Sequence, residues 1–184
     1  MLYFSLIGLA FLFLELAWIQ RLQLFLGHPV YATTTVLAAF LVFAGLGSFW
    51  SQRRSGVSEG RMLWPAVLLI LAFSLAYLLY LPGWLEQLAG LPLTGRIALV
   101  LALLAPLAFA MGVPFPVGLS HLGDAAPGLV PWAWGINGCA SVVSAVAATL
   151  LAAEIGFNGL MLVALICYLL LPAIGLQRIR GSAE

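Results

Sequence analysis

Five stretches of this chain carry no charged residue, and each is long enough to cross a lipid bilayer. They cover residues 22–52, 62–85, 97–123, 125–153 and 155–177. A sixth apolar stretch, residues 2–20, is interrupted only by Glu15. A transmembrane helix needs about 20 consecutive apolar residues, and in lipid a continuously apolar segment satisfies its backbone hydrogen bonds by forming a helix. The sequence therefore predicts an all-α, polytopic integral membrane protein with six transmembrane helices.

The composition leaves little material for a water-facing surface. Only 7% of the 184 residues are charged and 64% are hydrophobic, whereas a soluble domain has about 25% charged residues. Six spans and their short loops use the whole length, so we expect one transmembrane domain, residues 1–184, and no separate soluble domain. The net charge of +1 gives no general attraction to nucleic acid, and we expect no nucleic-acid partner.

The expected spans begin and end where polar residues and prolines interrupt the apolar stretches. Their predicted ranges are residues 2–20, 29–50, 62–81, 96–113, 131–153 and 158–176. Pro29 and Pro131 fall in first helical turns, where a missing N–H costs little, and Pro106 is expected to kink the fourth span. Glu15 in the first span, with no basic residue before it, argues against a cleaved signal peptide.

The arginines predict the orientation of the bundle, because cytoplasmic loops carry an excess of basic residues. Five of them fall on one side of a six-span chain, in the second loop and in the tail: Arg53, Arg54, Arg61, Arg178 and Arg180. Only Arg21 and Arg96 fall on the other side. We therefore expect both termini in the cytoplasm.

Two connecting segments have internal character. Within residues 83–91, four apolar side chains share one helical face, which predicts a short helix on the outer surface of the membrane. Residues 114–131, PFPVGLSHLGDAAPGLVP, are rich in Pro and Gly and predict an irregular cytoplasmic loop.

The fifth span carries small residues at every fourth position. One row consists of Ala140, Ser144, Ala148 and Ala152, and a second row of Asn137, Ser141, Ala145, Thr149 and Ala153. Small residues at this spacing let another helix approach closely. The sequence leaves two explanations open, namely tight packing within the chain and an interface with another subunit.

Glu15 is the most distinctive polar residue, because an acid inside a transmembrane span is costly and usually faces protein or water. Three threonines of the second span lie at a similar depth, Thr33, Thr34 and Thr35. We expect Glu15 to accept a hydrogen bond from one of these threonines or from another helix. It is then either a hydrogen-bonded packing residue or part of a proton or cation relay. Asn137 and Ser141 are further candidate polar residues within a span.

A second group of polar residues is expected at the outer ends of the spans, where ion pairs are plausible: Arg21, His28, Arg96 and Glu154, with Asn158 beside them. His28 precedes Pro29, which indicates a turn with a solvated or capping histidine. His28 and His121 fall on opposite sides of a bilayer core about 30 Å thick, so they share no metal site.

No residue pattern indicates a reaction. The segment Gly45–Ser48 lacks the preceding strand and the lysine of a nucleotide-binding loop. Cys139 and Cys167 lie in different spans, which favours small buried thiols over a disulfide. We therefore expect no catalytic, cofactor-binding or metal-ligating residue, and we expect bound lipid.

Four segments together resemble a known family. They are LELAWIQRLQLFLGHPVYA from Leu14, GLGS from Gly45, AMGVPFPVGL from Ala110 and PWAWGINGCASV from Pro131. The combination resembles the membrane portion of bacterial membrane-bound spermidine synthase-like proteins. That resemblance implies the cytoplasmic (inner) membrane of a bacterium and an aminopropyltransferase-like domain that this chain lacks, so the family's activity is not assigned to this polypeptide.

Three functions follow as hypotheses. The first is a non-catalytic integral membrane subunit that scaffolds or anchors other integral or membrane-associated proteins. The second is a small transporter or half-transporter in which two copies of the chain form the pathway. The third is the membrane half of a split spermidine synthase-like enzyme.

Overall fold

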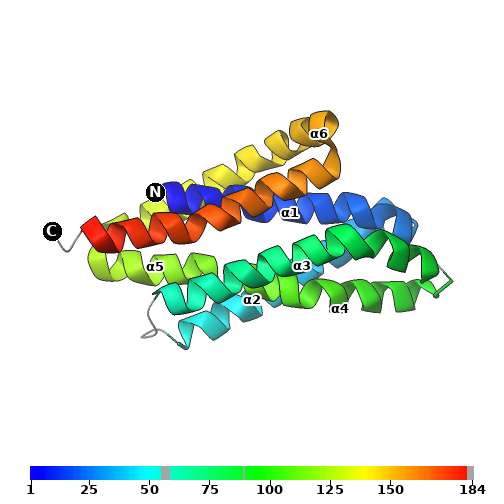
Figure 1. Cartoon of the computed structure of the whole chain (residues 1–184), viewed down its shortest axis with the longest axis horizontal. Coiled ribbons are helices and arrows are strands. Elements are labelled where there is room, and N and C mark those ends of the chain that lie inside the picture. The colour runs from blue at the N-terminus through cyan, green and yellow to red at the C-terminus, as the bar shows by residue number, and fades with distance from the viewer. Residues whose placement is uncertain (55–58, 89, 182–184) are drawn as a thin grey trace.

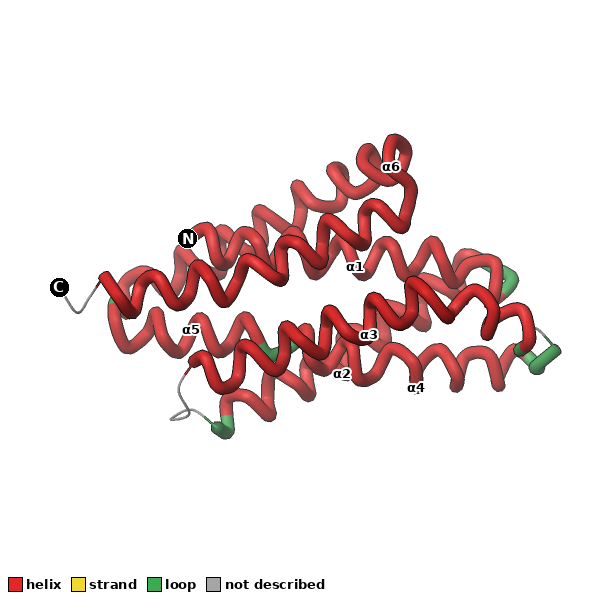
Figure 2. Tube along the Cα trace, in the orientation of Figure 1, coloured by secondary structure: helices red, strands yellow, loops and turns green. Residues whose placement is uncertain are grey.

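The computed structural model describes residues 1–54, 59–88 and 90–181, and in these ranges helices are the only regular secondary structure (Figures 1 and 2). The elements are α1 (Leu2–Leu26), α2 (Pro29–Gln52), α3 (Glu59–Gln87), α4 (Leu93–Met111), α5 (Pro114–Ala125), a 3-10 turn η1 (Pro127–Leu129) and α6 (Val130–Gly181). Five helical segments are long and apolar enough to cross a membrane. The prediction of an all-helical chain with several helices long and apolar enough to span a membrane is therefore confirmed.

The 52 residues of α6 form two helices that fold back on each other. The break is at Gly156, whose φ of 71° and ψ of 173° are not helical and which as a glycine adopts a positive φ without steric cost. Figure 1 shows the two halves as a hairpin, with the turn near the label α6. We call residues 130–155 the first half and residues 157–181 the second half of α6. Each half is long enough to cross a membrane by itself.

Residues 83–87 continue α3 instead of forming a separate surface helix, so the expectation for residues 83–91 is wrong there. Residue 89 lies outside the described residues. Leu81 and Tyr77 are buried, and the apolar face that suggested a surface helix continues their spacing one turn further along α3.

The segment expected to be an irregular loop is mostly helical, since α5 and η1 cover residues 114–125 and 127–129. Pro114 lies in the first turn of α5, a position that proline favours because its missing N–H has no helical partner there. The Tyr3 hydroxyl donates to the Pro114 carbonyl at 2.7 Å, and the rings of Phe4 and Phe115 pack edge to face at 5.7 Å. These contacts hold α5 against the start of α1.

Helix α1 is the most buried helix of the bundle and contacts α2, α4, α5 and α6. Its first half packs closely on the first half of α6. A Cβ atom at Gly8 would lie 2.6 Å from the Asn137 carbonyl oxygen. The Asn137 amide donates to the Phe4 carbonyl at 3.0 Å, and the Ser144 hydroxyl donates to the Leu9 carbonyl at 3.0 Å. Small residues and interhelical hydrogen bonds therefore join these two helices.

Helices α2 and α4 cross at a pair of glycines. A Cβ atom at Gly47 would overlap the Phe109 carbonyl, and a Cβ atom at Gly112 would overlap the Ala44 carbonyl. Backbone therefore meets backbone at this crossing, as is common between membrane helices with small interfacial residues.

Candidate functional site

Glu15 lies inside the bundle and is only 5% exposed. Among the described residues no group donates a hydrogen bond to its carboxylate, so the expected bond from Thr34 or Thr35 is not formed. For Thr34 the reason is rotation about α2. Phe40 is the residue of α2 whose ring meets Phe11 of α1, at 5.6 Å. Thr34 is exposed and lies about 120° away from Phe40 around a helix of 3.6 residues per turn, whereas Thr35 is buried at 6% exposure.

Three other buried polar atoms in the described part of the chain also lack a hydrogen-bond partner. They are Trp18 Nε1, Ser74 Oγ and the Tyr168 hydroxyl. Buried side-chain polar atoms nearly always have a partner, either protein or ordered water. Four unpaired groups from three helices are therefore a distinctive feature of this bundle. We call Glu15, Trp18, Ser74 and Tyr168 the central polar layer.

The depth of three of these residues follows from one ring contact. Trp18 of α1 and Tyr77 of α3 pack edge to face with centroids 5.3 Å apart. Figure 1 shows α1 and α3 running in the same direction. Glu15 and Ser74 each precede the paired aromatic residue by three positions, about 4.5 Å along the axis. Glu15 and Ser74 therefore lie at the same depth, one turn from the Trp18–Tyr77 pair.

Tyr168, on the second half of α6, lies about one helical turn from the depth of Glu15. Arg21 donates from Nη1 to Asn158 Oδ1 at 2.6 Å, which sets the register of α1 against α6. Along the axis of α1, Glu15 lies about 9 Å from Arg21. Along the axis of the second half of α6, Tyr168 lies about 15 Å from Asn158. The two helices are antiparallel here, and helical side chains tilt toward their own N-terminus. The tilts bring the Tyr168 hydroxyl and the Glu15 carboxylate closer in depth.

The central polar layer contains an acceptor without donors and donors without acceptors. Tyr77 does not lack a hydrogen-bond partner, because its hydroxyl donates to the Leu103 carbonyl at 2.5 Å. Water molecules bridge such groups where a site is polar and offers two to four partners. An intramembrane acid among unpaired polar groups is also typical of proton and cation pathways.

The candidate residues at the Gly156 end do not gather into one ion-pair cluster. Arg21 pairs with Asn158, while Arg96 donates to the carbonyls of Phe25 and Leu91, at 2.9 Å each. His28 accepts a hydrogen bond at Nδ1 from the Val30 amide at 3.2 Å, so it caps α2.

Glu154 is exposed beside the Gly156 turn. Within the described ranges no three His, Cys, Asp or Glu side chains lie close enough together to hold a metal ion.

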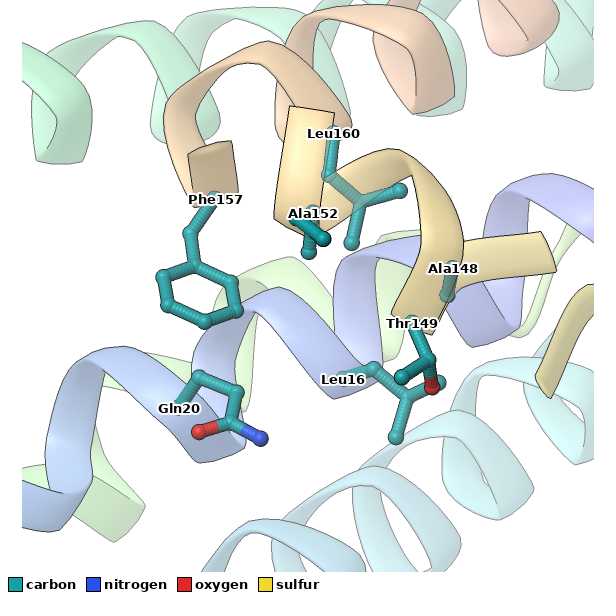
Figure 3. Close-up of a pocket in the computed structure, with 8 residues that line it drawn as sticks. Leu16, Gln20, Ala148, Thr149, Ala152, Phe157 and Leu160 are labelled. Carbon is teal, nitrogen blue, oxygen red and sulfur yellow. The ribbon is translucent and has the colours of Figure 1, made fainter. Parts of the chain in front are cut away.

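A pocket of about 250 Å³ lies between α1 and the α6 hairpin (Figure 3). Gln20 and Phe157 lie toward one end of it, and Leu16 and Thr149 toward the other. Small residues of the first half of α6, such as Ala152, create its volume. The pocket was not predicted from the sequence, although both rows of small residues in the fifth span contribute to its lining.

The two rows of small residues in α6 have different surroundings. Ser144 and Ala148 are buried, and the Ser144 hydrogen bond places their row against α1. In the second row Asn137 and Ser141 are half-buried. Ser141 donates to the Asn137 carbonyl of its own helix.

The opposite side of the first half of α6 is uncovered. Cys139 lies there and is exposed, so the expectation that it is buried is wrong. A Cβ atom added at Gly135 or Gly138 would meet no heavy atom within 4 Å, and Val142 is 72% exposed. We call Gly135, Gly138, Cys139, Val142 and Val146 the outward face of α6.

Comparison with known proteins gives no relative from which a function can be transferred. No family model, no curated protein and no solved structure matches this chain. The resemblance to spermidine synthase-like membrane portions therefore stays a prediction.

Proposed function

We propose that this chain is a non-catalytic integral membrane subunit that anchors partner membrane proteins. In this proposal it crosses the cytoplasmic membrane of a bacterium six times, with α1 to α4 and the two halves of α6 as spans. The fold-back at Gly156 supports an even number of crossings, and the excess of arginine on one side favours cytoplasmic termini.

The outward face of α6 is the observation that supports this proposal best. A span that meets only lipid gains nothing from glycine, which costs a helix about 1 kcal/mol relative to alanine. Gly135 and Gly138 nevertheless lie one turn apart on this face, with open space around them. Small residues on an uncovered membrane helix allow a second helix to approach its backbone. A partner helix explains their presence on this face.

Isolation of the tagged chain from its native membranes in mild detergent tests the proposal. We expect one or more integral membrane proteins to co-purify in a fixed ratio to the chain, as measured by mass spectrometry. A chain that is monomeric and brings no other membrane protein with it contradicts the proposal.

The proposed cytoplasmic position of both termini gives a separate prediction. In a variant without Cys139 and Cys167, a single cysteine at Thr94 is expected to react with a membrane-impermeant maleimide in intact cells. A single cysteine at Gln52 is expected to react only after permeabilisation, because both positions are exposed but lie at opposite ends of the bundle. The reverse labelling pattern would contradict cytoplasmic termini.

A small transporter acting as a homodimer is the second candidate function, and the central polar layer favours it. If Glu15 carries protons or cations, Glu15→Gln is expected to lower their flux into liposomes by about tenfold or more. Glu154→Gln is the matched control, since Glu154 is exposed. Equal flux in both variants would contradict this candidate. The split-enzyme hypothesis rests on the family resemblance alone.

A further inference from the structure

The pocket between α1 and the α6 hairpin is partly open and has mostly apolar walls. Leu16, Leu160 and Ala152 form much of its lining. The Thr149 hydroxyl also borders it but donates to the Ala145 carbonyl of its own helix at 3.1 Å. That hydroxyl therefore needs no partner in the pocket, and the walls favour a hydrocarbon occupant.

The end of the pocket near Gly156 is polar, and the basic residue Arg21 lies beside it. Gln20 and Phe157 line this end, and the next residue of each helix, Arg21 and Asn158, joins α1 to α6 by a hydrogen bond. Asn158 is neutral, so the charge of Arg21 is not compensated by this partner. A guanidinium group presents five N–H donors in a planar fork that matches a phosphate group. Arg21 therefore keeps donors for an anionic group placed at this end.

The volume of the pocket decides between a lipid chain and a protein helix. A helix with its side chains is about 10–12 Å wide, too wide for a pocket of about 250 Å³. Pockets that enclose a whole drug-sized molecule measure about 300–1,000 Å³. The pocket therefore fits part of one flexible chain, and membrane lipid is the source of such chains around a membrane-spanning helix.

We propose that this pocket binds one acyl chain of an anionic membrane phospholipid, whose phosphate lies beside Arg21. In this proposal the acyl chain enters between α1 and the second half of α6, beside Phe157 and Gln20. Lipid binding in this pocket does not involve the outward face of α6, so its test is independent of the test of the proposed subunit role.

Native mass spectrometry of the protein tests this site after reconstitution into nanodiscs containing equal amounts of phosphatidylglycerol and phosphatidylcholine. We expect wild-type protein to retain one phosphatidylglycerol per chain. Ala152→Leu fills the pocket and is expected to lower retention by about tenfold, a change of about 1.4 kcal/mol in binding. Ala145→Leu, on the same helix but outside the pocket lining, is expected to retain lipid as wild type does.

A second pair of variants tests the head-group contact. Arg21→Gln is expected to abolish the preference for phosphatidylglycerol, whereas Arg53→Gln, at the opposite end of the bundle, is expected to preserve it. Thr149→Leu fills the pocket from its exposed rim and replaces Ala152→Leu as the test variant if that protein does not fold. Unchanged retention in a folded pocket-filling variant, or wild-type retention of both lipids in equal amounts, overturns the proposal.

Discussion

Gly112→Val is expected to destabilise the protein by about 3 kcal/mol, the upper end of the usual cost of overpacking. The added side chain would overlap the Ala44 carbonyl of α2, and a backbone group cannot rotate away as a side chain can. The φ of Gly112 is −73°, which any residue adopts, so the expected loss is steric. The measurement is the unfolding free energy in detergent micelles.

Gly45→Val is the matched control for this variant. Gly45 lies on the same helix as Ala44, but nothing lies within 4 Å of a Cβ atom there. We expect its unfolding free energy to stay within about 0.5 kcal/mol of wild type, as for surface substitutions in general. Equal destabilisation by Gly45→Val and Gly112→Val would contradict the close crossing of α2 and α4.

Gly138→Leu is expected to lower the recovery of co-purifying membrane proteins by about tenfold or more, equivalent to about 1.4 kcal/mol of binding. The leucine side chain would hold a partner helix away from the backbone of α6. The fold itself should tolerate the change, because the space around Gly138 is open. The measurement is quantitative mass spectrometry of the purified complex together with the thermal stability of the chain.

Gly45→Leu provides the comparison for the binding experiment, since it adds the same side chain to a lone open glycine on another helix, with no second open glycine one turn away. Its partner recovery should equal that of wild type. If both variants lose the partner equally, or if neither does, the outward face of α6 is not the interface.

The apolar stretches were sufficient to predict the helices, because a bilayer allows continuously apolar segments little choice of structure. Two connections were predicted wrongly. Pro114 suggested a loop but begins α5, since a proline near the start of a helix and a proline in a loop look alike in sequence. The apolar face after Pro82 suggested a surface helix, although residues 83–87 continue α3.

The candidate site could be predicted only in part. Sequence position gives the depth of Glu15 and of the threonines of α2, but not how far each threonine is rotated from the neighbouring helix. Ser74 and Tyr168 were not singled out, because their significance lies in being buried without a partner. The small-residue pattern of α6 could not distinguish the row that packs on α1 from the face that is uncovered.

Photo-crosslinking in native membranes tests the proposed subunit role most directly. A photoreactive amino acid at Val142 reports on the outward face of α6, and one at Leu79 reports on an equally exposed position of α3, because these residues are 72% and 70% exposed. We predict a discrete protein adduct from position 142 and lipid adducts alone from position 79. Lipid adducts alone from both positions would contradict the account.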